Sequence, residues 1–263
     1  MLLGAFLMGK WLPAANEIHR MGIEITLRCG LHCPQCDHHC DHPELSWITD
    51  SDMTLAQIDY FLKEMHDTDT RIVRLTLTGG DLLLHPNVVE IARRVQQILV
   101  NSGRLYRHRL RVIVNGLVDP PKELNCYCGA KTLLPVLKRA EKHFAMHSAP
   151  CDTGQRLRRH CSGAACNIPY RCGFVLNKYG YYPCGPGGAI IRLFGLSRWC
   201  RYELPIKPWE TWDLRKLRAE VCSLCQYGAK YSKIQAEYPK PSQSFARALA
   251  SPAPCPRIYG EEA

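Results

Sequence analysis

Strand-like and helix-like segments alternate over the first 150 residues of this chain of 263 residues. The expected strands are residues 21–27, 71–78, 109–114 and 143–147. The expected helices, with apolar side chains at helical spacing, are residues 53–66, 87–99 and 133–142. Such alternation predicts a parallel sheet with crossover helices, and hence an α/β fold. Only about four strand–helix units fit into this length, which excludes a closed eight-stranded barrel and favours a partial, TIM-like (β/α) barrel.

Residues that can do chemistry follow the expected strands directly. A cysteine-rich stretch, "TLRCGLHCPQCDHHC", follows the first strand, Gly79-Gly80-Asp81 the second, Asn115-Gly116 the third and Ser148 the fourth. The carboxyl ends of parallel strands meet at one edge of a sheet, where open α/β sheets place their ligands. A common site is therefore expected at this edge.

The chain has 15 cysteines. No stretch approaches the roughly 20 apolar residues that a membrane span requires. The opening "MLLGAFLMG" lacks the basic start and the cleavage site of a signal peptide, so we expect an N-terminal arm over residues 1–21 and a cytoplasmic location. Cysteine clusters in that compartment usually bind metal rather than form disulfides.

Cys29, Cys33 and Cys36 have the spacing C-x3-C-x2-C. Three thiolates can hold three irons of a 4Fe-4S cluster and leave the fourth iron open to a ligand that is not protein. With this spacing the sequence resembles the radical S-adenosylmethionine (radical SAM) superfamily. The resemblance continues in order through "LTLTGGDLLLHP" and "VIVNG", which look like the family's motifs at the ends of its second and third strands. It covers about residues 22–150.

The resemblance implies an enzyme that reductively cleaves S-adenosylmethionine to a 5′-deoxyadenosyl radical, which abstracts hydrogen from a substrate. An external one-electron donor, similar to flavodoxin or ferredoxin, would supply the electron. The residues implied to bind the cofactor are Gln35, Gly79, Gly80, Asp81, Asn115 and Ser148. Two of them depart from the family pattern: Gln35 stands where an aromatic residue is usual, and Asp81 where glutamate is usual. No catalytic acid or base can be named.

Two other interpretations of the cysteine stretch stay open. One is a zinc site, for which Cys40, His38, His39 and His42 supply further ligands. The other is a closed cluster with Cys40 as fourth ligand, which would make the protein an electron carrier. Neither alternative predicts the later glycine motif. We therefore expect the three histidines to be loop residues rather than metal ligands.

A second cysteine set is expected in residues 151–235. The set Cys172, Cys184, Cys222 and Cys225 resembles the auxiliary-cluster domain called twitch, a shortened relative of the SPASM domain. The resemblance implies one auxiliary 4Fe-4S cluster, and zinc in the same thiolates is the alternative. Another metal site could use the remaining cysteines Cys126, Cys128, Cys161 and Cys166, whereas Cys40, Cys151 and Cys200 have no assigned role. Residues 236–263, rich in proline and serine, are expected to form a loose tail.

The net charge is +10, with basic runs at residues 104–111 and 156–160. This charge favours an anionic partner, such as a nucleotide, a phosphorylated metabolite or an acidic peptide. The substrate itself cannot be inferred. The alternative to an enzyme is a non-catalytic module that zinc stabilises and that binds nucleic acid.

Overall fold

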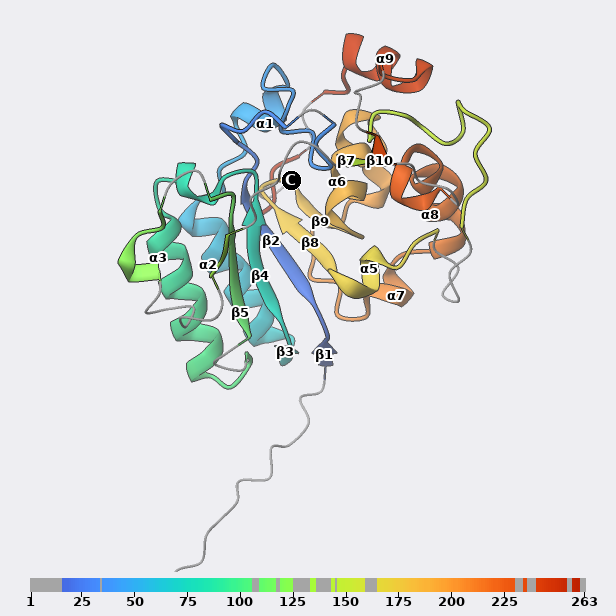
Figure 1. The fold of residues 1–263 in the computed structure, drawn as a ribbon. Coiled ribbons are helices and arrows are strands. Elements are labelled where there is room, and N and C mark those ends of the chain that lie inside the picture. The colour runs from blue at the N-terminus through green and yellow to red at the C-terminus, as the bar shows by residue number, and fades with distance from the viewer. Residues whose placement is uncertain are drawn as a thin grey trace, which may run out of the picture.

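The structure, a computed structural model, describes residues 16–33, 35–105, 109–116, 119–124, 133–135, 143–144, 146–158, 165–229, 234–235, 240–254 and 257–260. A six-stranded sheet forms the centre of the described part, as Figure 1 shows. Its strands, in spatial order, are β6 (Leu133–Pro135), β5 (Leu110–Val114), β4 (Leu75–Gly79), β2 (Met21–Thr26), β8 (Phe174–Asn177) and β9 (Gly180–Tyr182). All neighbours are parallel except β8 and β9, so the expected α/β class with a largely parallel sheet is confirmed.

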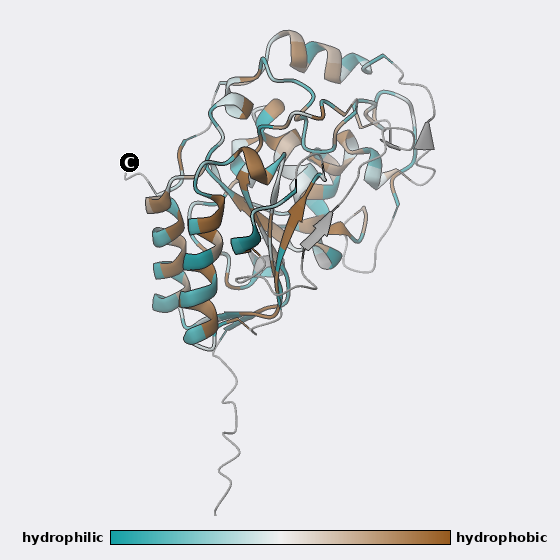
Figure 2. Cartoon of the chain, turned by 60° about the vertical axis from the view of Figure 1, so that its left-hand side comes forward, coloured by the Kyte–Doolittle hydropathy of each residue, from teal (hydrophilic) through white to brown (hydrophobic). Residues whose placement is uncertain are grey.

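Helices α2 (Leu55–Asp67) and α3 (Val88–Val95) cover one face of the sheet (Figure 1). Each helix is hydrophobic on one side and hydrophilic on the other (Figure 2). A capping box starts α2, because Thr54 accepts a hydrogen bond from Gln57 N–H and the Gln57 side chain accepts one from Thr54 N–H. Alternate strand residues pack against the helices and are completely buried, among them Met21, Ile23, Leu75, Leu77, Leu110 and Val112. Neither α2 nor α3 covers the opposite face of the sheet.

The third helix–strand unit differs from the expectation. Leu133–Pro135 is the parallel edge strand β6 rather than the start of a helix, and residues 136–142 lie outside the described part. A proline lacks the N–H that a helix interior needs but is tolerated in an edge strand. The expected fourth strand is the short β7 (His143–Phe144), which pairs antiparallel with β10 (Ile234–Gln235) outside the main sheet. A further pair, β1 (Asn16–Ile18) with β3 (Thr70–Ile72), is parallel.

The cysteine-rich second half shares the main sheet. The hairpin of β8 and β9 turns at Lys178 and Tyr179, as the sequence predicts, and β8 lies beside β2 with Phe174 opposite Met21. The remaining helices are α1 (Ser46–Thr49), α5 (Ile168–Arg171), α6 (Gly185–Leu193), α7 (Pro208–Thr211), α8 (Leu214–Glu220) and α9 (Gln243–Ala250). None of the helices described here is both long and apolar enough to cross a membrane.

The C-terminal segment is not a loose tail. Phe245 of α9 and Tyr259 are both completely buried. The Gln57 side chain donates hydrogen bonds to the carbonyls of Tyr259, at 2.7 Å, and Lys178, at 3.1 Å. Two apolar anchors in a segment otherwise rich in proline and serine therefore attach it to the core, although composition alone favours a solvated tail.

Candidate functional site

A cavity of about 410 Å³ lies against the face of the sheet that α2 and α3 leave uncovered. The strand residues that line it alternate with the buried core residues: Gly22, Thr76, Thr78, Arg111, Ile113 and Val175. The other walls come from residues 29–40, from α5 and from the start of α6. The cavity thus reaches from the first half of the chain to the cysteine-rich second half.

The three cysteines after β2, here named the first cysteine group (Cys29, Cys33 and Cys36), all line this cavity. The thiols of Cys33 and Cys36 are buried, and Cys29 is half-buried. Burial raises the pKa of the Cys29 thiol, and the neighbouring Cys36 adds to that shift. A metal centre reverses this effect by stabilising the thiolates. Three converging thiols beside open space fit a cluster that keeps one coordination position for another ligand.

Polar contacts fix the start of the cysteine loop. The backbone N–H of Leu27 donates to the Ser51 hydroxyl at 2.7 Å, and the Thr26 hydroxyl donates to Asp52 at 2.6 Å. The Arg28 guanidinium bonds the same Asp52 carboxylate at 2.5 and 3.1 Å, and together these contacts lower the carboxyl pKa although burial opposes the shift. The first cysteine is therefore held in place by the segment that precedes α2.

The glycine pair at the end of β4 presses against this anchored segment. Gly79 has a φ of +144°, and a Cβ there would lie 1.9 Å from the Thr26 carbonyl oxygen. A Cβ on Gly80 would lie 2.3 Å from the Arg28 carbonyl oxygen. Only glycine permits this approach, and both residues line the cavity. The glycine pair thus packs the end of β4 against the start of the cysteine loop, and its contact with a cofactor stays a prediction.

Asp81 is buried and does not line the cavity. Its backbone N–H donates to the Arg28 carbonyl at 2.7 Å, and its carboxylate accepts from Leu83 N–H at 3.1 Å. It thus caps the short 3-10 helix η1 (Leu82–Leu84). In this structure Asp81 positions the end of β4.

The other residues expected to bind the cofactor divide into two groups. Asn115 lines the cavity, with its amide nitrogen 4.0 Å from the Cys29 sulfur. Gln35 and Ser148 are not among the lining residues. The Gln35 side chain accepts a hydrogen bond from His147 N–H at 2.6 Å, so it ties the cysteine loop to a distant segment.

A second cavity, about 20 Å³ in volume, contains four cysteines, here named the second cysteine group (Cys166, Cys184, Cys222 and Cys225). The cavity is otherwise lined by apolar residues and glycines: Ile168, Pro169, Pro183, Pro186, Gly187, Leu217, Val221 and Gly228. Burial raises the pKa of all four thiols, and Cys166 adds to the shift at each of the other three. Four converging thiols without open space fit a closed tetrahedral or cluster site.

This group differs in one member from the predicted auxiliary set Cys172, Cys184, Cys222 and Cys225, which stays a prediction. Cys172 lines the large cavity instead, and Cys166 joins Cys184, Cys222 and Cys225. The single turn of α5 separates Cys166 from Cys172, which places them on different cavities. Spacing along the chain could not decide between the two, because both precede the hairpin. The alternative partners Cys126, Cys128 and Cys161 lie outside the described residues.

Three arginines line the large cavity, Arg74, Arg111 and Arg171, and only Arg111 belongs to a basic run that the sequence analysis singled out. Within the described part of the chain, none of the three pairs with a carboxylate, and Arg74 Nε has no hydrogen-bond partner. Burial lowers the pKa of Arg74, and the positive charges of Arg111, Arg20 and Arg109 lower it further. This end of the cavity is therefore electropositive.

Comparison with known proteins gives a weak likeness. No protein-family model matches the chain, and no curated protein matches it. A crystal structure of BtrN in complex with AdoMet and 2-DOIA is similar with 13% sequence identity and a TM-score of 0.44, over 85% of this chain and 98% of that one. A structure of BtrN in an open conformation is similar with 13% identity and a TM-score of 0.41, over 81% and 96%. Such values carry no argument about function, which rests on the residues of this chain.

Proposed function

We propose that this protein is a radical SAM enzyme with one auxiliary 4Fe-4S cluster, built on a partial (β/α) barrel. The observation that carries the proposal is the shared cavity. Three thiols with C-x3-C-x2-C spacing lie on the same cavity as the close-packed Gly79-Gly80 pair and Asn115. A zinc knot or a packed cluster of thiols needs no glycine pair at a neighbouring strand end.

The roles of the residues follow from their positions. Cys29, Cys33 and Cys36 would hold a 4Fe-4S cluster, which supplies the electron that cleaves S-adenosylmethionine to a 5′-deoxyadenosyl radical. Gly79 and Gly80 leave the wall beside the cluster free of side chains, so that backbone groups can bind the methionine end of the cofactor. Asn115 offers an amide on the same wall, and the contact of Ser148 with the ribose stays a prediction.

Gln35 receives a different role from the one that the family pattern suggests. Its amide oxygen is already used by His147 N–H, and Gln35 does not line the cavity. We assign it to holding the loop of Cys33 and Cys36 in shape. The adenine would then rest on other residues of the cavity wall.

The second cysteine group is proposed as the ligand set of the auxiliary cluster. The support is the shared cavity, which four cysteines from three segments line, one of them buried and three half-buried. Iron and zinc analysis of protein reconstituted without oxygen distinguishes the two metals. The proposal expects about eight irons per chain and no zinc in the cysteine sites.

The substrate is proposed to be anionic, since three arginines without carboxylate partners in the described structure line the cavity. Equilibrium dialysis with inorganic pyrophosphate, a small polyanion, tests this directly. The double variant Arg74→Gln with Arg111→Gln should bind pyrophosphate at least about ten-fold more weakly, because both charges are partly desolvated. Arg198→Gln is the control, since Arg198 is exposed and pairs with Glu220 outside the cavity. Equal affinity in all three proteins would contradict an anionic substrate site.

One observation favours a second candidate function, an electron carrier with a closed cluster. Cys40 is buried and lines the same cavity as the first cysteine group, so it could supply a fourth ligand. An assay for 5′-deoxyadenosine under a strong reductant separates the two functions, because a closed cluster gives none. An external electron donor is needed in either case.

A further inference from the structure

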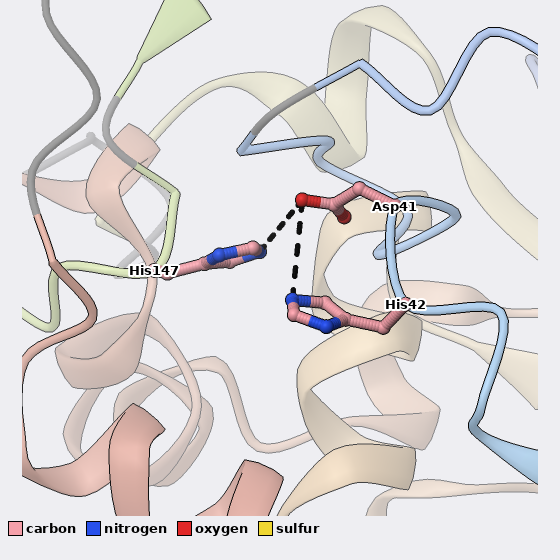
Figure 3. A group of neighbouring side chains, drawn as sticks. All are labelled: Asp41, His42 and His147. Atoms are coloured by element: carbon pink, nitrogen blue, oxygen red, sulfur yellow. Dashed lines mark ion pairs between the residues drawn. The ribbon is translucent and has the colours of Figure 1, made fainter.

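Two imidazoles and a carboxylate converge at the end of the cysteine loop, where the Asp41 carboxylate also accepts a hydrogen bond from Gln35 N–H, next to Cys36 (Figure 3). Asp41 and His42 follow the third cysteine of the loop, whereas His147 comes from the other side (Figure 3). One carboxylate oxygen of Asp41 lies 3.9 Å from His42 Nε2 and 3.7 Å from His147 Nε2. All three ligand atoms lie within 4.8 Å of one another.

These separations are too long for hydrogen bonds. They suit a shared ion, because ligands about 2.0–2.1 Å from a tetrahedral zinc lie roughly 3.4 Å from each other. The ring nitrogens that face Asp41, Nε2 of His42 and Nε2 of His147, are buried and have no hydrogen-bond partner in the described structure. The Asp41 oxygen that faces them, Oδ2, accepts a hydrogen bond from Gln35 N–H at 2.9 Å and has a further lone pair for an ion, whereas Oδ1 has no partner there. A buried polar atom left in this state destabilises the fold, and a bound ion would offset that cost.

The surroundings prepare the imidazoles to act as ligands. His42 Nδ1 lies 3.0 Å from a carboxylate oxygen of Glu44, so a proton on Nδ1 bonds Glu44 and leaves the Nε2 lone pair directed at Asp41. A carboxylate behind a ligating histidine is the usual outer partner in metal sites. His147 is 3% exposed, and burial together with His42 lowers its pKa to about 3. The neutral imidazole, which such burial favours, is the form that binds metal.

A further buried histidine lies against this group. His39 is completely buried, and neither of its ring nitrogens has a hydrogen-bond partner in the described structure. Its ring stacks on His147 at 4.8 Å and on Phe245 of α9 at 5.6 Å. These contacts close the site from the side of α9.

We propose that Asp41, His42 and His147 bind a divalent transition-metal ion, with zinc as the best fit. Imidazole and carboxylate donors suit zinc, and zinc binds such sites more tightly than ferrous iron does. The ion joins the loop of the first cysteine group to residue 147, across the same gap that the hydrogen bond from His147 N–H to Gln35 crosses. Its role is structural, since it fixes the loop without a cysteine ligand.

The test measures zinc in full-length protein after anaerobic iron–sulfur reconstitution and equilibrium dialysis against zinc. We expect about one zinc per chain in addition to the iron, and a zinc-edge X-ray absorption spectrum with imidazole and oxygen neighbours and no sulfur. His147→Gln should abolish this zinc. His66→Gln should keep it, because the His66 side chain is exposed on α2 and pairs with Asp67 instead of Asp41.

A milder variant keeps the test decisive if His147→Gln fails to fold. Glu44 is 65% exposed, so Glu44→Gln leaves the core intact. Loss of the outer carboxylate should weaken zinc binding about 10- to 100-fold. Any of three results would overturn the proposal. These are a wild type that holds no zinc, equal amounts of zinc in the wild type and both site variants, and zinc that is bound through sulfur.

Discussion

The two cysteine groups differ in what surrounds their sulfur atoms. The first has three cysteines on one loop, beside a cavity of about 410 Å³ that strand ends and arginines also line. The second has four cysteines from three segments around about 20 Å³ of apolar space. Open space beside three thiols permits a ligand to reach a bound metal, whereas four thiols in closed packing exclude it. On this ground we propose cofactor chemistry for the first group and electron storage or structural support for the second.

The largest expected effect follows from removing a member of the first group. Cys36→Ala should reduce the iron content by about four atoms per chain and reduce 5′-deoxyadenosine formation below detection. The reason is that an open cluster is held by three thiolates, and two remaining thiolates do not retain it. Colorimetric iron analysis and chromatography of the reaction products check both outcomes. If this variant still forms 5′-deoxyadenosine, the first cysteine group does not take part in the cleavage of S-adenosylmethionine.

Removal of the second group should affect stability more than cofactor cleavage. Cys222→Ala with Cys225→Ala should also lose about four irons, yet still form 5′-deoxyadenosine. The melting temperature should fall by roughly 10 °C, because the bound metal joins segments of the fold, and losing about 3 kcal/mol has that effect in a chain of this size. Calorimetry of anaerobic samples gives the shift. If this variant retains the full iron content, the second group is not a cluster site.

A matched pair of single variants tests which cysteine belongs to the second group. Cys166→Ala should lose the auxiliary iron, because Cys166 faces Cys184, Cys222 and Cys225. Cys172→Ala should keep it, because Cys172 lines the other cavity. Iron analysis with electron paramagnetic resonance of the reduced protein reports both. The reverse pattern would restore the set inferred from the sequence.

The glycine pair offers a smaller test of the first cavity. Gly79→Ala should destabilise the protein by about 3 kcal/mol, since its Cβ would meet the Thr26 carbonyl in a strained backbone conformation. Gly30→Ala is the control, because a Cβ there has no atom within 4 Å. Urea denaturation of both variants measures the difference. Equal stabilities would mean that the close approach of β4 to the loop does not exist.

The smallest effect is expected at Cys40. If the cluster is open, Cys40→Ala should leave the iron content unchanged and change the rate of 5′-deoxyadenosine formation by less than about two-fold. The thiol would then be a packed neighbour on the cavity wall. Loss of about four irons would instead identify Cys40 as the fourth ligand of a closed cluster.

The sequence predicted the parts of this fold that local pattern determines. The strands around Ile23, Leu77 and Val112 and the helix around Ile58 follow from periodicity, whereas the cap at Thr54 was seen only in the structure. The place of the β8–β9 hairpin beside β2 depends on contacts between distant segments, and no local signal announces it. Pro135 was the one available sign that residues 133–142 do not start as a helix.

The candidate site also has a part that local sequence predicts and a part that depends on contacts between distant segments. The spacing of Cys29, Cys33 and Cys36 and the glycine pair are contiguous motifs, so they could be found in the sequence. The exchange of Cys172 for Cys166 depends on one turn of α5. His147 and His42 become neighbours only through the fold, and a loop histidine of this kind is ordinarily solvated. The place of the arginines on the cavity was hidden because alternation in a strand does not say which face borders open space.

The central claim is that the first cysteine group cleaves S-adenosylmethionine. Its most direct test is to incubate the anaerobically reconstituted protein with S-adenosylmethionine and dithionite and to quantify 5′-deoxyadenosine. The account predicts 5′-deoxyadenosine in the wild type and none in the Cys36→Ala variant. A wild-type protein with full iron content that forms no 5′-deoxyadenosine would contradict it.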